Sequence, residues 1–115
     1  MLLNLLKNAA QAIHQRPTGQ VPGRIILRCK LSPPWAEIQV EDNGVGMPEA
    51  VRKRIFEPFF TTKEIGQGTG LGLSVAYFII TNNHKGQMEV HSKLGQGSCF
   101  SVRLPLQLLV DQQGV

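Results

Sequence analysis

Two asparagines could together hold a metal ion and phosphate groups. Asn4 and Asn8 lie four residues apart in a segment with helical periodicity, so their side chains stand one turn apart on one face. A neutral amide oxygen can ligate a hard cation such as Mg²⁺, which takes few protein ligands and shares phosphate oxygens with a nucleotide. Taken alone, the pair is better explained as two solvated asparagines.

A carboxylate stands where a strand pattern predicts a buried side chain. Apolar and polar residues alternate up to Val40, and the next inward position is Asp42. A buried carboxylate needs hydrogen-bond donors, and the exocyclic amine of adenine is one, whereas guanine presents a carbonyl there. The sequence Asp-Asn-Gly-Val-Gly over 42–46 is also typical of a hairpin turn, but Pro48 and a short helix follow in place of a strand. We therefore interpret Gly44 and Gly46 as letting the backbone pass close to a ligand.

A second glycine-rich segment leads directly into a helix. Residues 66–72 read Gly-Gln-Gly-Thr-Gly-Leu-Gly. Free N–H groups at a helix N-terminus bind phosphate readily. The spacing fits neither a P-loop, which needs a following Lys-Ser/Thr, nor a dinucleotide-binding Gly-x-Gly-x-x-Gly after a strand.

Between the two glycine segments lies an aromatic stretch, Phe-Glu-Pro-Phe-Phe-Thr-Thr-Lys over residues 56–63. One interpretation is that Phe56, Phe59 and Phe60 cap the edge of the core. The other is a lid whose rings fasten it to the body and whose Lys63 meets the terminal phosphates. We expect both interpretations to be partly true.

Helices and strands must position these groups. Apolar periodicity predicts helices over 2–14 and 71–83 and a short one over 48–54, and the 71–83 helix, apolar almost all round, is expected to be the more buried. In the first helix, the core face is predicted to hold Leu2, Leu6, Ala9 and Ile13, flanked by Leu3 and Ala10, with Asn4, Asn8 and Gln11 opposite.

Four alternating segments predict four strands, each with one apolar face. Their inward residues are predicted to be Ile25, Leu27, Cys29 and Leu31; Ala36, Ile38 and Val40; Met88, Val90 and Leu94; and Phe100, Val102 and Leu104. This set of elements predicts an α/β fold, a two-layer sandwich with helices on one face of a mixed sheet.

Composition is that of one soluble globular domain. The chain has 115 residues, 42% hydrophobic and 17% charged, and a net charge of +4. Its basic residues are scattered without interleaved aromatics, which argues against nucleic acid as a partner. Cys29 and Cys99 lack metal-ligand spacing and are expected to be reduced structural thiols. No apolar run is long enough to span a bilayer, so no membrane contact is expected.

Taken in order, these segments resemble the nucleotide-binding boxes of sensor histidine kinases, a family of the superfamily that includes gyrase, heat-shock-90 chaperones and MutL. Residues 2–9 are similar to the asparagine box, 42–46 to the first glycine box, 56–60 to the phenylalanine box and 68–73 to the second glycine box. Residues 95–100 resemble the closing Gly-x-Gly-Thr-x-Phe element, with Ser98 at the Thr position. The short lid resembles that of nitrogen-regulation sensor kinases.

The resemblance implies a Bergerat-type ATP-binding fold with ATP and Mg²⁺ as cofactors. It implies that Asn8 is the Mg²⁺ ligand, Asn4 a phosphate-side contact, Asp42 the adenine acceptor supported by Ser98, and Met47 the packing surface under the base. The implied catalytic residues are Asn4, Asn8 and Lys63. The other implied ATP contacts are Gly44, Gly46, Thr62, Gly68, Thr69, Gly70, Leu71 and Gly72.

Three departures from the pattern bear on function. Hydrolases of the superfamily carry a Glu where Asn4 stands, and an amide cannot accept the proton of an attacking water, which favours phosphoryl transfer to a protein. Many sensor kinases have a basic residue at the position of Gln11. The chain begins inside the asparagine box, without the phosphoacceptor-histidine helix. The sequences around the three histidines, His14, His84 and His91, differ from the sequence around a phosphoacceptor histidine. We therefore expect none of the three to be the acceptor.

The resulting hypothesis is an ATP-binding domain over residues 1–106, incomplete at its N-terminus, with a tail over 107–115. It would supply the γ-phosphate of ATP to a histidine on a separate dimerisation domain of a homodimeric parent protein. A response-regulator receiver domain would then accept the phosphoryl group in two-component signalling. The expected location is cytoplasmic, whether or not the parent is membrane-anchored. The isolated chain is expected to bind ATP weakly and to be inactive alone. The alternatives are an ATPase switch and a non-catalytic pseudokinase domain.

Overall fold

The computed structural model describes residues 2–17, 21–57 and 72–106. Helices and strands follow the order predicted from the sequence. They are α1 (Leu2–His14), β1 (Ile25–Ser32), β2 (Trp35–Asp42), α2 (Glu49–Arg52), α3 (Gly72–Phe78), the π-helical turn η1 (Ile79–Asn83), β3 (Gln87–Lys93) and β4 (Gly97–Pro105).

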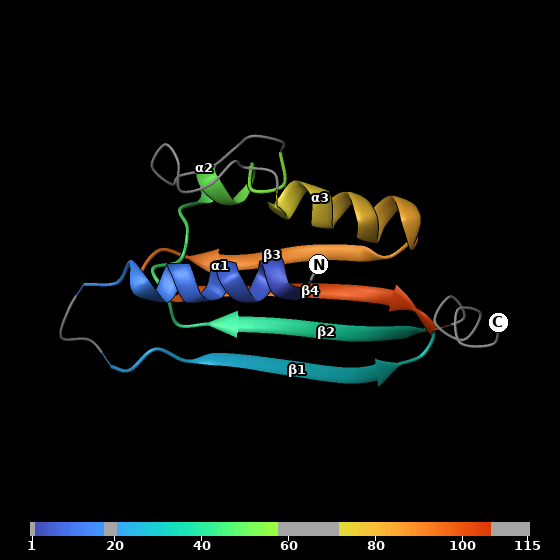
Figure 1. Ribbon diagram of the computed structural model, residues 1–115, viewed down its shortest axis with the longest axis horizontal. Coiled ribbons are helices and arrows are strands. Elements are labelled where there is room, and N and C mark those ends of the chain that lie inside the picture. Colours follow the sequence, from blue (N-terminus) through green and yellow to red (C-terminus); the bar gives the residue numbers. More distant parts are fainter. Residues whose placement is uncertain (1, 18–20, 58–71, 107–115) are drawn as a thin grey trace.

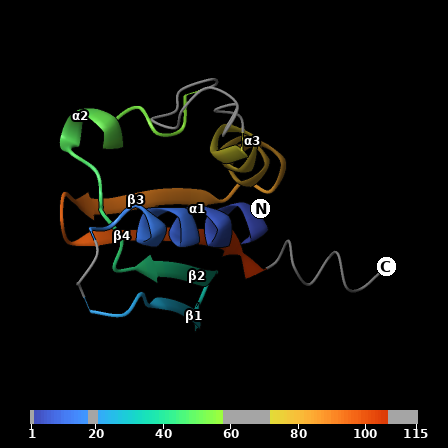
Figure 2. The same cartoon turned by 60° about the vertical axis from the view of Figure 1, so that its left-hand side comes forward.

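The four strands form one sheet in the order β1-β2-β4-β3. All three pairings among the described strands are antiparallel, so the expectation of a mixed sheet was wrong for this part of the chain. Helix α1 lies along one face of the sheet, while α2 and α3 lie at its β3 side (Figure 1, Figure 2). The α/β architecture of helices packed on one sheet is confirmed. None of the helices in the described ranges is long and apolar enough to cross a membrane.

The core lies between α1, α3 with η1, and the inward face of the sheet. In α1 the buried residues are Leu5 and Ala9. The predicted core face included Ala9 but not Leu5, so the helix is rotated about its axis relative to the prediction. Asn4 and Asn8 border this face and are half-buried, not opposite to it. The buried apolar residues of the core are Leu5, Ala9, Val40, Ala76, Ile80, Met88, Val90, Phe100 and Val102.

Strand β1 faces the predicted way but is not covered. Its register pairs Leu27 with Val40 and Cys29 with Ile38, and directly paired residues of antiparallel strands share a face. Yet Leu27 is 48% and Leu31 73% exposed. The prediction that this strand is half-buried was wrong, because β1 is the outermost strand of the described sheet and the alternation of a strand specifies a face, not a neighbour to cover it.

Helix α3 is less buried than its composition predicted. Val75 is 48% and Phe78 56% exposed, and within α3 only Ala76 is buried. The helix contacts the sheet and α1 with one side only, so apolar residues on its other side stay in contact with solvent. Leu94, predicted to point inward, is 68% exposed because it lies beyond β3 in the turn before β4. In β2 the outward-facing Glu37 is buried, paired with Arg103 at 2.9 Å.

Candidate functional site

Asp42 ends β2 with its side chain buried, as the alternation of the strand predicted. Its Oδ1 accepts a hydrogen bond from the backbone N–H of Gly44 at 2.8 Å, and its carboxylate also accepts one from the backbone N–H of Ser98. Burial raises the pKa of Asp42, while these two hydrogen bonds lower it and the charge of Glu41 raises it slightly. The net effect is a raised pKa. Desolvation of this carboxylate is therefore only partly compensated by the protein, and a further donor would stabilise its charged form.

The glycines that follow Asp42 are required by the protein's own backbone. A Cβ on Gly44 would lie 2.6 Å from the carbonyl carbon of Ala12, so this loop packs directly on α1. Gly46 has a φ of 70°, and a Cβ there would lie 2.0 Å from the carbonyl oxygen of Lys93. The close approach predicted at these glycines exists, but within the described residues the group approached is backbone of α1 and of the β3–β4 turn.

The loop from Asp42 to Met47 is held on both sides. On one side, Val45 N–H donates to the carbonyl of Ala12 at 3.1 Å. On the other, Gly95 N–H donates to the carbonyl of Val45 at 2.6 Å, and Met47 N–H donates to the hydroxyl of Ser92 at 2.8 Å. The loop is thereby clamped between the end of α1 and the β3–β4 hairpin.

Ser92 was missed by the sequence analysis. It occupies the inward phase of β3 after Met88 and Val90, so a polar residue stands where the alternation predicts an apolar one. The same signal identified Asp42. Ser92 pairs with Ser98 across the β3–β4 ladder, and Ser98 pairs with Asp42 across the β2–β4 ladder. The sheet thus places three polar side chains in one row at the end of the core.

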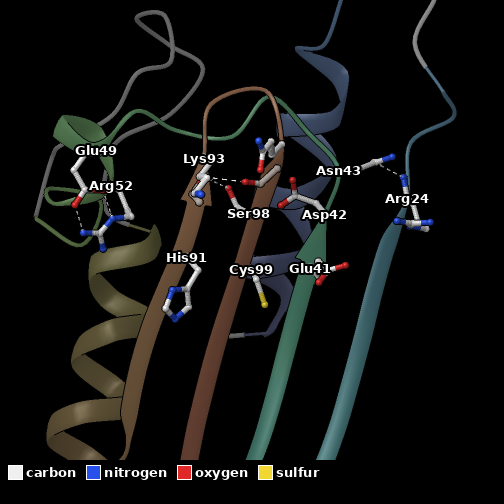
Figure 3. A pocket seen from close by; sticks show the side chains of 13 residues that line it. Arg24, Glu41, Asp42, Asn43, Glu49, Arg52, His91, Lys93, Ser98 and Cys99 are labelled. Atoms are coloured by element: carbon white, nitrogen blue, oxygen red, sulfur yellow. Dashed lines mark hydrogen bonds and ion pairs between the residues drawn. The ribbon is translucent and has the colours of Figure 1, made fainter.

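An open pocket of about 580 Å³ lies at this end of the sheet. Figure 3 shows it on the face turned away from α1, with Glu41, His91 and Cys99 on its strands and the Glu49–Arg52 ion pair of α2 at one side. Asp42 and Ser98 line the pocket, whereas Asn4 and Asn8 do not. The pocket therefore reaches the Asp42 row from the outer face, whereas Asp42 itself shares the inward face of Val40, the side on which α1 carries the two asparagines.

The two asparagines of α1 have different environments. Asn4 donates from Nδ2 to the carbonyl oxygen of Gly72 at 3.3 Å, which joins two predicted site residues from distant parts of the sequence. Asn8 is half-buried, and its side chain makes no hydrogen bond to any residue in the ranges 2–17, 21–57 and 72–106. Its amide oxygen is thus available to a cation, which is the chemistry that a single Mg²⁺ ligand requires.

Phe56 lies at the edge of the core. Its ring stacks on Tyr77 with centroids 4.7 Å apart and meets Phe100 edge-on at 6.4 Å. The interpretation that Phe56 caps the core edge is confirmed. The remaining predictions on this stretch and on the second glycine box fall outside the described residues, as does the nitrogen-regulation type of lid. They concern Phe59, Phe60, Thr62, Lys63, Gly68, Thr69, Gly70 and Leu71.

Metal binding by a cluster of side chains is not supported. Within the described part of the chain, no group of three or more His, Cys, Asp or Glu residues is placed to hold a metal ion. Cys29 is exposed and Cys99 half-buried, and both are free thiols. A cation bound here would therefore take most of its ligands from a bound anion and from water.

Residues 1–108 match the family of histidine kinase-, DNA gyrase B- and HSP90-like ATPases. The chain belongs to this ATPase family. Over 99% of its length it is 44% identical to the two-component sensor PprA of Pseudomonas aeruginosa, and over 92% it is 43% identical to the signal transduction histidine-protein kinase AtoS of Escherichia coli. It spans only 12% of PprA and 16% of AtoS.

Solved structures show the same ATPase fold. The catalytic domain of histidine kinase ThkA superposes with a TM-score of 0.73 at 34% identity, covering 90% of this chain and 62% of that chain. The mycobacterial sensor histidine kinase MprB superposes with a TM-score of 0.72 at 31% identity, covering 90% of this chain and 68% of that chain. The Bergerat-type fold expected from the resemblance is confirmed.

Proposed function

We propose that this chain is the ATP-binding part of a sensor histidine kinase. The observation that carries the proposal is the buried carboxylate of Asp42, which receives two backbone N–H groups and still has a raised pKa. The amine of an adenine is a donor to such a group, whereas the carbonyl of a guanine is an acceptor that the carboxylate would repel. ShkA, which superposes with a TM-score of 0.73 at 30% identity, was solved full-length in complex with AMPPNP.

The remaining roles follow the same assignment. Asn8 is the Mg²⁺ ligand, because its amide oxygen is not engaged by any described residue. Asn4 lies one turn before it, facing the phosphates, and Met47 packs under the base. Lys63, Thr62 and residues 68–71 would contact the phosphates from the lid and the second glycine box. Bound Mg²⁺ would neutralise charge on the phosphates during transfer.

Phosphoryl transfer to a histidine is favoured over hydrolysis. The side chain at position 4 is an amide whose Nδ2 already donates to the carbonyl of Gly72. It cannot accept a proton from water, so the general base of an ATPase switch is missing at this position. The acceptor histidine would belong to a separate dimerisation domain, and a response-regulator receiver domain would take the phosphoryl group afterwards. A pseudokinase domain would bind nucleotide without this transfer.

Nucleotide binding is tested by titrating the isotope-labelled chain with ATP and Mg²⁺ and following its amide signals by NMR, which detects millimolar affinity. We expect Asp42→Asn to weaken binding of ATP at least about tenfold, since a hydrogen bond to a charged group contributes about 1.5–3 kcal/mol. Asn8→Ala should reduce the dependence of binding on Mg²⁺. Gln15→Ala, at an exposed position just beyond the same helix, is the matched control. Wild-type binding that neither substitution weakens would refute the site.

Transfer is tested in a chimera in which this chain replaces the corresponding segment of AtoS, the relative at 43% identity. Incubation with γ-labelled ATP should give a phosphoprotein that is stable in alkali and labile in acid, as a phosphohistidine is. Release of free phosphate without labelled protein would favour the ATPase switch. Nucleotide binding with neither product would favour the pseudokinase.

A further inference from the structure

The hydroxyl of Ser92 is a junction of three hydrogen bonds. It accepts from the backbone N–H of Met47 at 2.8 Å, donates to the carbonyl oxygen of Gly97 at 3.0 Å, and lies 2.7 Å from the hydroxyl oxygen of Ser98. A serine hydroxyl has one proton and two acceptor positions. These three contacts therefore use its full capacity.

This arrangement fixes the direction of the third bond. The Gly97 carbonyl can only accept, so the single proton of Ser92 points to it. The proton between the two hydroxyls must then come from Ser98, and its hydroxyl cannot at the same time donate to Asp42. Ser98 instead donates a hydrogen bond to the Asp42 carboxylate from its backbone N–H. The position of this N–H is set by the backbone at the start of β4.

Two glycines make this junction tight. A Cβ on Gly97 would lie 2.1 Å from the carbonyl oxygen of Asp42, and a Cβ on Gly46 would lie 2.0 Å from that of Lys93. The Asp42–Met47 loop and the β3–β4 hairpin thus meet backbone to backbone, and Ser92 is the half-buried side chain that bonds to both. In the described structure, its one oxygen links residues 47, 97 and 98.

We propose that Ser92 is a positioning residue that sets the places of Asp42 and Met47 and thereby the recognition of the adenine amine. The inference rests on the proposed function for its ligand and on the hydrogen bonds above for its geometry. The hydroxyl of Ser92 is fully engaged by Met47, Gly97 and Ser98, so it would act on the nucleotide through Asp42 and Met47. Its removal would therefore lower discrimination between purines more than it lowers binding of the phosphates.

The test compares two nucleotides with Mg²⁺: ATP, and purine riboside triphosphate, which lacks the exocyclic amine. We expect the wild type to bind ATP about tenfold more tightly or better, since the amine meets a carboxylate. In Ser92→Ala this ratio should fall to within about threefold. Ser92→Thr, which keeps the hydroxyl, should retain most of it, and Ser101→Ala, a buried serine of β4 that accepts from Gln39, is the matched control. Equal losses for both nucleotides, or an unchanged ratio, would show that Ser92 has no such role.

A second measurement does not depend on nucleotide. Hydrogen exchange of the Met47 amide should be at least about tenfold faster in Ser92→Ala, because a lost hydrogen bond of about 1.4 kcal/mol corresponds to a factor of ten. Ser101→Ala should leave it unchanged. Unaltered exchange in Ser92→Ala overturns the positioning role. If the wild type binds neither nucleotide but the Met47 amide responds, the proposed function fails while the junction at Ser92 stands.

Discussion

The side-chain amide of Asn4 donates a hydrogen bond to the backbone carbonyl of Gly72 at 3.3 Å, across 68 positions of the sequence. Asn4 lies on α1 and Gly72 is the first residue of α3. The bond therefore joins the asparagine box to the end of the second glycine box. It also engages the side-chain donor group of Asn4, the position at which the resemblance implies a glutamate in hydrolases of the superfamily.

Replacing Asn4 by aspartate keeps its size but removes the donor and places a charge beside a carbonyl oxygen. We expect Asn4→Asp to lower the free energy of unfolding by about 0.5–1.5 kcal/mol, the usual contribution of one hydrogen bond. Urea unfolding followed by circular dichroism measures it. Gln11→Glu, the same charge change at an exposed position of α1, is the control. Equal effects of the two substitutions would mean that the bond to Gly72 contributes nothing.

The turn between β3 and β4 offers two glycines in the same conformational region with different surroundings. Gly95 has a φ of 81° and no atom within 4 Å of the position that a Cβ would take, whereas at Gly97, with a φ of 93°, a Cβ would meet the Asp42 carbonyl oxygen at 2.1 Å. We expect Gly95→Ala to cost about 1–2 kcal/mol of unfolding free energy from backbone strain alone. Gly97→Ala should cost about 3 kcal/mol or more and weaken ATP binding. Comparable losses would show that contact with Asp42 is unimportant.

Asp42 should make the fold more stable in acid. Because its pKa is raised in the folded state, its contribution to the free energy of unfolding is fully present below the ordinary pKa of 3.8 and is lost as the pH rises through the folded-state pKa. The free energy of unfolding of Asp42→Asn relative to that of the wild type should therefore be higher near pH 7 than near pH 3. Urea unfolding of both proteins across this range gives the difference directly, so that groups common to both, such as Glu49, cancel. A difference that is constant with pH would contradict the raised pKa.

The orientation of α1 can be tested with two leucines. Leu5 is fully buried, whereas Leu3 is 62% exposed. We expect Leu5→Ala to lower the free energy of unfolding by about 2–5 kcal/mol through lost burial and a cavity. Leu3→Ala should change it by less than about 0.5 kcal/mol, since leucine and alanine have similar helix propensities at exposed sites. Thermal or urea unfolding measures both. A larger loss from Leu3→Ala would mean that α1 packs with the face first predicted from its periodicity.

Local patterns of the sequence were sufficient for the elements and for one decisive residue. Alternation with period two predicted the four strands, and the interruption of that alternation by a carboxylate identified Asp42 as a buried polar group. The order of the boxes led to the ATPase family, which the comparisons confirm. The strands and the buried carboxylate depend only on residues close to one another along the chain, whereas the family depends on the order of short motifs along its whole length.

Only the tertiary structure decided which of the predicted faces are covered and what the polar groups contact. A strand pattern specifies a side of the sheet, but the exposure of Leu27 and Val75 depends on which elements lie against them. The clamp on the Asp42 loop is made by Ala12 and Ser92, which lie far from it in the sequence. Such contacts arise from long-range pairing of strands and packing of helices, which cannot be read from residue types and their local spacing.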